Sequence, residues 1–228
     1  VVIWLIALVL CGPAQAEPEL ARAKVIDFFQ RAFPEYKLDD YTYGALMFRP
    51  EARKQFDDIM EFPPFLTTIE RGKQMWERAF SNGKRLADCF DNGGRNAAAA
   101  FPRHDRQRNQ VITFEMAVNN CLRQNRQPPL ALDDMNTMGV LMSYARTLSD
   151  GAHLDVRAET PEARTKLEIG RADYYQRRGQ MNLACANCHI DLAGRFMRDE
   201  IISPVVGQAT HFPVFRRGGE QLLTVQAY

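Results

Sequence analysis

The chain has 228 residues, enough for one large or two small domains. Charged residues make up 25% of it and the formal net charge is +1. This balance gives no reason to expect binding to nucleic acid or to an anionic membrane surface. No run shows the sustained alternation of apolar and polar residues that is typical of strands, so we expect a mostly α-helical protein.

Residues 1–16 have the pattern of a signal peptide. The apolar run at residues 1–11 is too short to span a bilayer, and the Ala-Gln-Ala sequence that follows it matches a cleavage site. We therefore expect export to the periplasm, a mature chain that starts near Glu17, and no membrane span. Cys11 would leave with the signal peptide. The alternative is a lipid-attachment cysteine, although Leu10 is large for the position before it.

An N-terminal helical extension is expected over residues 17–62. Apolar residues recur at helical spacing as far as Phe33, Pro34 interrupts them, and a second helix is indicated near residues 50–60. The two prolines that follow this extension mark a domain boundary.

Beyond that boundary we expect two domains, at residues 63–152 and 153–228. Thr67 with Glu70 has the pattern of a capping box and predicts a helix that continues to about residue 80. Further helices are expected at residues 111–122, at residues 133–148 and after Pro161, with polar loops or linkers at residues 95–110 and 149–160.

Cys185, Cys188 and His189 form a Cys-x-x-Cys-His motif. Two thiols about one helical turn apart can form thioethers with two vinyl groups of a porphyrin, and the adjacent imidazole is then an iron ligand. A zinc site would need a second pair of ligands, and a dithiol redox pair would need a preceding strand and no histidine. The motif predicts one covalent haem c, attached through the two cysteines and ligated by the histidine.

Two parts of the chain resemble each other. Residues 72–76 resemble residues 170–174, as a glycine followed by a basic and aromatic segment. The Phe-Pro pair at residues 101–102 resembles the pair at residues 212–213, with similar residues at the same distance after each pair. We therefore expect two cytochrome c-like domains in tandem, of which the second is incomplete.

The first copy lacks the residues that would bind haem. Asn92 and Gly93 occupy the positions of the second haem cysteine and of the iron-ligating histidine. We expect this copy to carry no haem, which leaves Cys89 free to form a disulfide with Cys121; two free thiols are the alternative. The same alignment predicts a counterpart of Cys121 about four residues beyond Tyr228, facing the haem.

At these residues the chain resembles the SoxA family, the larger cytochrome subunits of the SoxAX complex of thiosulfate oxidation. The likeness extends from about Thr67 to Tyr228 and is most specific at residues 115–121, 178–189, 194–195 and 212–216. Some members of that family have two haems, and others have one haem and a disulfide in place of the other. The missing haem ligands of the first copy make this chain similar to the single-haem members.

The resemblance implies an L-cysteine S-thiosulfotransferase subunit. Such an enzyme joins thiosulfate oxidatively to a cysteine of a SoxYZ carrier protein, works with a SoxX cytochrome subunit, and passes electrons through haem to a small c-type cytochrome. In the family the distal haem ligand and reaction centre is a cysteine shortly after the segment that matches residues 212–216. No catalytic residue is therefore assigned within the 228 residues, and the expected cysteine lies beyond Tyr228.

Positively charged side chains near the haem motif are candidates for a substrate channel, because thiosulfate is a dianion. They are Arg195, Arg198, Arg216 and Arg217, of which we single out Arg216. Solvated surface charge is the alternative for each of them.

A simple electron-transfer cytochrome is the main alternative function. It would use a methionine or a second histidine as the distal iron ligand. His211 is a candidate for that role, whereas Met197 lies too close to His189 in the chain to reach the opposite face of the haem. His104 and His153 lie in polar loops and are expected to be exposed without partners. A haem sensor is a further alternative, for which the chain has no recognisable output domain.

Overall fold

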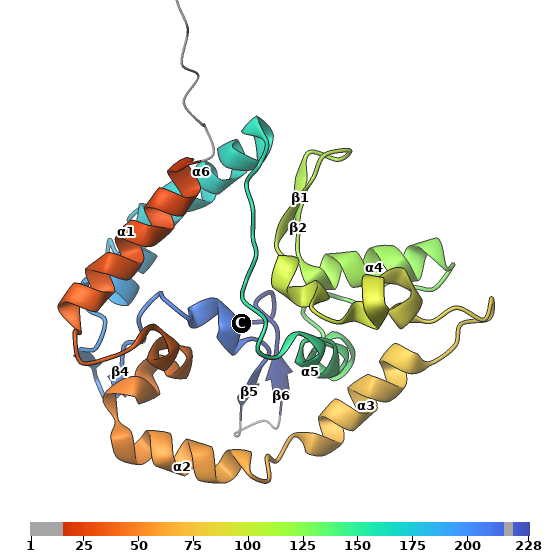
Figure 1. Ribbon diagram of the computed structural model, residues 1–228, viewed down its shortest axis with the longest axis horizontal. Coiled ribbons are helices and arrows are strands. Elements are labelled where there is room, and N and C mark those ends of the chain that lie inside the picture. Colours follow the sequence, from red (N-terminus) through yellow and green to blue (C-terminus); the bar gives the residue numbers. More distant parts are fainter. Residues whose placement is uncertain (1–15, 217–220) are drawn as a thin grey trace, which may run out of the picture.

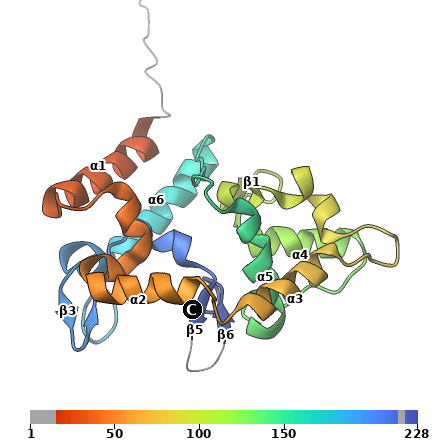
Figure 2. The same ribbon diagram turned by 60° about the horizontal axis from the view of Figure 1, so that its bottom comes forward.

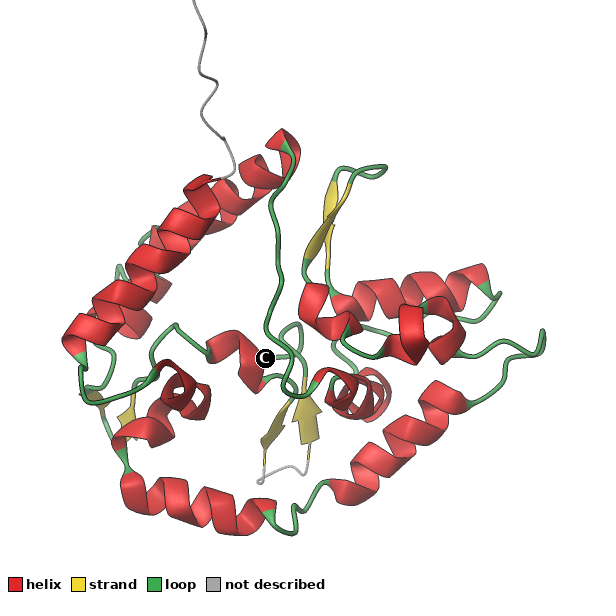
Figure 3. Cartoon of the chain, viewed as in Figure 1, coloured by secondary structure: helices red, strands yellow, loops and turns green. Residues whose placement is uncertain are grey.

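A computed structural model describes residues 16–216 and 221–228. The expected signal peptide, apart from its last residue, lies outside the described residues, and so does Arg217. The described part is mostly helical, as predicted (Figure 3). Its α-helices are α1 (Ala16–Ala32), α2 (Pro50–Met60), α3 (Leu66–Glu77), α4 (Phe114–Gln124), α5 (Val140–Ala145) and α6 (Pro161–Tyr175).

Short antiparallel pairs account for the strands of the described residues. They are β1 (Arg103–Asp105) with β2 (Gln110–Ile112), β3 (Phe196–Met197) with β4 (Glu200–Ile201), and β5 (Val214–Arg216) with β6 (Gln221–Leu223). The chain forms two lobes (Figures 1 and 2). One lobe contains α3, α4, α5 and the β1–β2 hairpin, the other contains α1, α2 and the β3–β4 hairpin, and β5–β6 lies between them.

We call residues 63–152 the first unit and residues 153–228 the second unit. In the first unit α3 crosses α5 closely at Gly72, where an added Cβ would collide with the Val140 carbonyl oxygen and the Tyr144 side chain. The glycine therefore allows the two helix backbones to approach each other. Around this crossing lies a core of buried residues that includes Trp76 and Phe114.

Helix ends follow the sequence signals only in part. Pro50 and Pro161 begin their helices as predicted, and Thr160 caps α6 by accepting a hydrogen bond from the Ala163 amide at 3.1 Å. The predicted capping box at Thr67 is wrong, because the N-cap of α3 is Phe65, two residues earlier, and no side chain caps the helix. That helix also ends at Glu77 instead of near residue 80, since the following backbone is extended.

The predicted polar loop at residues 95–110 contains strand β1 and leads into a hairpin. The next helix, expected from residue 111, begins only at Phe114, because residues 110–112 form β2 and Thr113 caps α4. β5 and β6 pair in the same register after the second Phe-Pro pair as β1 and β2 do after the first. Both Phe-Pro bonds are cis. The local likeness that the sequence shows after each Phe-Pro pair is thus also a likeness of backbone structure.

The N-terminal extension packs against the second unit. Phe29, Tyr41 and Met47 form a buried cluster with Ala193, which follows the Cys-x-x-Cys-His motif. The Tyr41 hydroxyl donates a hydrogen bond to the Phe29 carbonyl oxygen at 3.0 Å. The extension therefore forms its core with residues far away in the sequence. Among the described helices, none combines the length and the hydropathy that crossing a membrane would require.

The two related glycines provide a first prediction. Gly72→Ala should destabilise the protein by about 1–3 kcal/mol, because its methyl group collides with the α5 backbone. Gly170→Ala is the matched control: an added Cβ there meets nothing within 4 Å, so the better helix propensity of alanine should stabilise the protein by about 0.5–1 kcal/mol. Urea unfolding measures both, and shifts of the same sign would contradict the close crossing at α3.

The disulfide provides a second prediction. Cys89 and Cys121 are bonded across a sequence separation of 32 residues with their Cα atoms 5.9 Å apart. Replacing both with alanine should reduce the free energy of unfolding by about 3–4 kcal/mol in the chain-entropy model. Thiol reductant should lower the stability of the wild type by a similar amount and leave the double variant unchanged. A reductant effect of equal size in both proteins would refute this account.

Candidate haem site

A tight turn positions the Cys-x-x-Cys-His motif after α6. Arg178 and Leu183 pair through both of their backbone hydrogen bonds, at 3.1 and 3.3 Å. The Ala184 amide then donates to Asn187 Oδ1 at 2.9 Å, immediately before a short helical turn, Asn187–Asp191, that carries Cys188 and His189. The motif cysteines are consequently about one helical turn apart, as thioether attachment to one porphyrin requires.

Two hydrogen bonds hold His189 in place. Its Nδ1 lies 2.9 Å from the Ser203 carbonyl oxygen, and its own carbonyl oxygen accepts a hydrogen bond from the Val205 amide at 2.9 Å. A carbonyl oxygen only accepts, so Nδ1 carries the proton and Nε2 keeps the lone pair that can bind iron. The Gln208 side-chain amide lies 3.4 Å from the same Nδ1 and is a second neighbour of the ring.

The thiols of the motif are free and accessible. Cys185 is exposed and Cys188 is half-buried. The Tyr174 side chain is close to both: burial raises the pKa of its hydroxyl to about 12, and the neighbouring thiols add to the shift. The hydroxyl oxygen is buried and has no hydrogen-bond partner among residues 16–216 and 221–228. Large apolar side chains that flank the motif in the chain are exposed, namely Tyr175, Met181, Leu192, Phe196 and Met197.

These features fit a haem. Two accessible thiols can form the thioethers, and an imidazole of fixed tautomer can ligate the iron from one side. The unpartnered hydroxyl and the exposed apolar side chains are what a partly polar, largely apolar group would cover. Tyr174 and Ser203 were not identified from the sequence as part of the site. The likeness of residues 170–174 to residues 72–76 was a signal for the tyrosine. No sequence pattern marks a backbone carbonyl group, such as that of Ser203, as the partner of a histidine.

The corresponding region of the first unit is filled by side chains. Trp76, which corresponds to Tyr174, is buried and donates from Nε1 to the Gly93 carbonyl oxygen at 3.1 Å. Its ring stacks on Phe90 with the centroids 5.4 Å apart, and Phe90 contacts Phe114 at the same distance. The disulfide borders a groove of about 790 Å³ on this unit, whose wall includes Phe90.

In the structure the partner of His211 is a backbone carbonyl oxygen of the N-terminal extension. This contact differs from the iron ligation for which the histidine was a candidate. Its Nε2 lies 2.8 Å from the Thr42 carbonyl oxygen, and an added Cβ at Gly44 would collide with the imidazole ring. Burial lowers the pKa of His211, so the ring is neutral and donates to that carbonyl. His211 thus joins the N-terminal extension to the second unit. Met197 is on β3 and is exposed.

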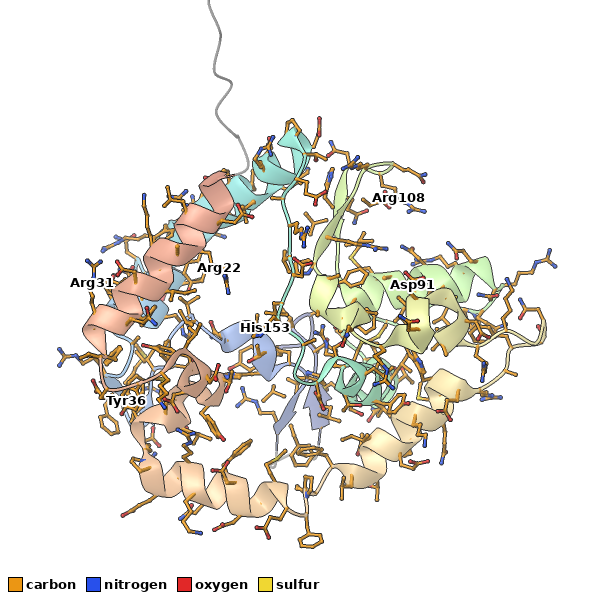
Figure 4. All side chains as sticks on the ribbon, viewed as in Figure 1. Arg22, Arg31, Tyr36, Asp91, Arg108 and His153 are labelled. Carbon is orange, nitrogen blue, oxygen red and sulfur yellow. A yellow bond between two sulfur atoms is a disulfide. The ribbon has the colours of Figure 1, made fainter. Side chains whose placement is uncertain are left out.

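The loop histidines differ from each other. His104 lies on β1 and contacts Asn109 Oδ1 at 3.0 Å through Nε2, so the expectation of a histidine without a partner is wrong there. His153 is exposed, and it belongs to the segment that connects α5 with α6, near the middle of the view in Figure 4. Figure 4 also shows Arg108 in the loop of the β1–β2 hairpin.

The candidate arginines are at the surface. Arg195, Arg198 and Arg216 are exposed. Arg216 is at the end of β5, and its guanidinium carbon lies 4.9 Å from the centre of the Tyr228 ring. This contact fixes the direction of the side chain and leaves its charge accessible to solvent.

Three comparisons with known proteins agree on a family. The family model described as SoxA/TsdA, cytochrome c domain, matches residues 71–154. The L-cysteine S-thiosulfotransferase subunit SoxA of Chlorobaculum tepidum is 40% identical over 189 residues, which cover 83% of this chain and 65% of that protein. The crystal structure of SoxXA from P. pantotrophus is similar with a TM-score of 0.63 and 28% sequence identity, covering 72% of this chain and 62% of the other.

The chain therefore spans about two thirds of the length of the Chlorobaculum relative. A protein of the same name from Allochromatium vinosum is 34% identical over 208 residues, which cover 90% of this chain and 73% of that relative. With this identity and coverage, and with a matching cytochrome c domain, the chain belongs to the SoxA family.

Proposed function

We propose that this chain is the haem-binding part of an enzyme that joins thiosulfate oxidatively to a cysteine of a SoxYZ-like carrier protein. The observation that carries the proposal is the pair of free thiols, Cys185 and Cys188, beside a histidine whose Nδ1 is already held by a carbonyl oxygen. The relatives named L-cysteine S-thiosulfotransferase subunit SoxA support the reaction.

The protein is proposed to carry one haem c, in the second unit. Cys185 and Cys188 would hold it covalently and His189 would ligate its iron through Nε2. The first unit would carry none, since Asn92 and Gly93 occupy the equivalent positions. The disulfide and the buried Trp76 support this assignment, because they take up thiols and space that a haem would use.

The proposed reaction forms one sulfur–sulfur bond between thiosulfate and the carrier thiol, and it releases the thiol proton and two electrons. Bound haem supplies a redox centre from which electrons can pass to a c-type cytochrome. Ser203 keeps the proton of His189 on Nδ1 and fixes the ring plane. The reaction is proposed to take place at a cysteine of this protein, the counterpart of Cys121 in the second unit. That cysteine is expected about four residues beyond Tyr228 and thus outside these 228 residues.

We also propose that the protein is exported and that it works with a second cytochrome subunit. Haem c attachment outside the cytoplasm agrees with the leader-like residues 1–16 and with a disulfide at Cys89. We place the protein in the periplasm with a SoxX-like partner, which the likeness to a SoxXA structure supports.

The haem assignment predicts a clear difference between two double variants. Cys185→Ala with Cys188→Ala should lose covalent haem and all thiosulfate-dependent, carrier-dependent reduction of a c-type cytochrome. Cys89→Ala with Cys121→Ala should keep one haem and most of the activity. Intact mass spectrometry of the exported protein counts the haems. A second covalent haem in the wild type would contradict the assignment. Activity is measured on the full-length protein that includes the expected cysteine beyond Tyr228, and inactivity of that haem-loaded protein with carrier and partner would refute the enzyme proposal and favour the electron-transfer alternative.

Arg216 provides a test of the proposed substrate channel. Its exposed guanidinium lies beside Tyr228 and would attract the thiosulfate dianion. Arg216→Gln should raise the KM for thiosulfate about three- to tenfold, up to ~1.4 kcal/mol, with little change in kcat. Arg95→Gln, at an exposed arginine of the first unit, is the matched control. Equal effects of the two substitutions on the KM would indicate that Arg216 acts only as general surface charge and does not line a substrate channel.

A further inference from the structure

The two units meet where α4 begins in the first unit and where a turn follows β6 in the second. The Gln226 side-chain amide donates to Thr113 Oγ1 at 3.0 Å and to Glu115 Oε2 at 3.2 Å. The Thr224 hydroxyl donates to the Leu132 carbonyl oxygen at 3.2 Å. The Gln226 contacts join the last described residues of the second unit to the beginning of α4, and the Thr224 contact joins them to the segment that follows α4.

The residues in this contact are counterparts of one another. Thr113 and Glu115 follow the first Phe-Pro pair at the same distances at which Thr224 and Gln226 follow the second. Thr113 caps α4, and its carbonyl oxygen accepts a hydrogen bond from the Ala117 amide at 3.0 Å. The Thr224 carbonyl oxygen likewise accepts one from the Tyr228 amide at 3.1 Å. A helical turn therefore begins after Thr224 as α4 begins after its cap.

A buried ion pair fixes the acceptor in this contact. The Glu115 side chain is 1% exposed, and its Oε1 accepts a hydrogen bond from Arg146 Nη2 at 2.6 Å. Burial alone would raise the pKa of Glu115, but the charge and the hydrogen bond of Arg146 hold that pKa below its usual value. Glu115 is therefore a carboxylate in a fixed position, and its other oxygen faces Gln226.

Backbone packing strengthens the same attachment. An added Cβ at Gly139 would collide with the Leu222 carbonyl oxygen, so β6 lies directly against the turn that precedes α5. Leu222 and Thr224 are buried. The first unit consequently contacts the turn after Thr224 through side chains, and it contacts β6, just before this turn, through the backbone.

We propose that Glu115, acting through Gln226, is a positioning residue that fixes the turn after Thr224, and that a helix continuing from this turn would hold the sulfur ligand of the haem iron in place. This inference rests on the proposed function, which puts that ligand on the same helix, at the counterpart of Cys121. The haem-less first unit then has a structural role as the support against which the ligand-bearing helix is aligned.

The experiment uses the full-length, haem-loaded protein. Gln226→Leu keeps most of the side-chain volume and removes both donated hydrogen bonds. Gln226→Glu sets a second carboxyl group against Glu115, where like charges repel. Gln124→Leu, at the exposed end of α4, is the matched control. The readouts are the rate at which cyanide displaces the distal ligand of the ferric haem, the electron paramagnetic resonance spectrum, and thermal unfolding as a check on folding.

We expect Gln226→Leu to raise the displacement rate about tenfold, equivalent to ~1.4 kcal/mol, with the control unchanged. Gln226→Glu should show a larger effect at neutral pH that shrinks as the pH falls and one carboxyl group takes up a proton. A wild-type haem without sulfur ligation would overturn the proposed function and this inference together. Sulfur ligation with displacement rates that neither Gln226 variant alters would overturn the inference alone.

Discussion

The interior of each small helical unit must be filled, and the rest of this structure depends on how each unit meets that constraint. In the first unit Trp76 packs on Phe90 and Phe114, and a disulfide joins Cys89, which directly precedes Phe90, to α4. In the second unit the tyrosine at the equivalent position has a hydroxyl group without a partner, beside two free thiols. Trp76, Phe90 and Phe114 pack on one another in the first unit, whereas in the second unit Tyr174 is next to accessible thiols.

The sequence predicted those parts of the fold that depend on local chemistry. Pro50 and Pro161 begin helices because their fixed φ suits the first helical position, and the haem motif defines its own spacing. The capping box at Thr67 failed because a match of residue types does not ensure the required backbone geometry. The β1–β2 hairpin was not predicted, since strands of three residues are too short for an alternating pattern to be recognised.

Contacts between distant segments were also beyond the reach of the sequence. His211 looked like a possible iron ligand because histidine in a haem protein suggests coordination. In the structure its ring binds the Thr42 carbonyl oxygen and packs against Gly44, which a side chain at that position would prevent. Only the fold brings the N-terminal extension to residues 205–211, and only then does the histidine gain a structural role.

The contact between Glu115 and Gln226 illustrates a general consequence of internal likeness. Glu115 and Gln226 stand at the same distance after their Phe-Pro pairs and contact each other. Two glutamates at these positions would place carboxylates about 3 Å apart in a buried site, where a like charge and the loss of hydration both oppose ionisation. A glutamine in one copy changes that repulsion into a donated hydrogen bond, while Arg146 neutralises the remaining carboxylate. The pairing of a glutamate with a glutamine at these positions therefore allows the start of α4 and the turn after Thr224 to pack together.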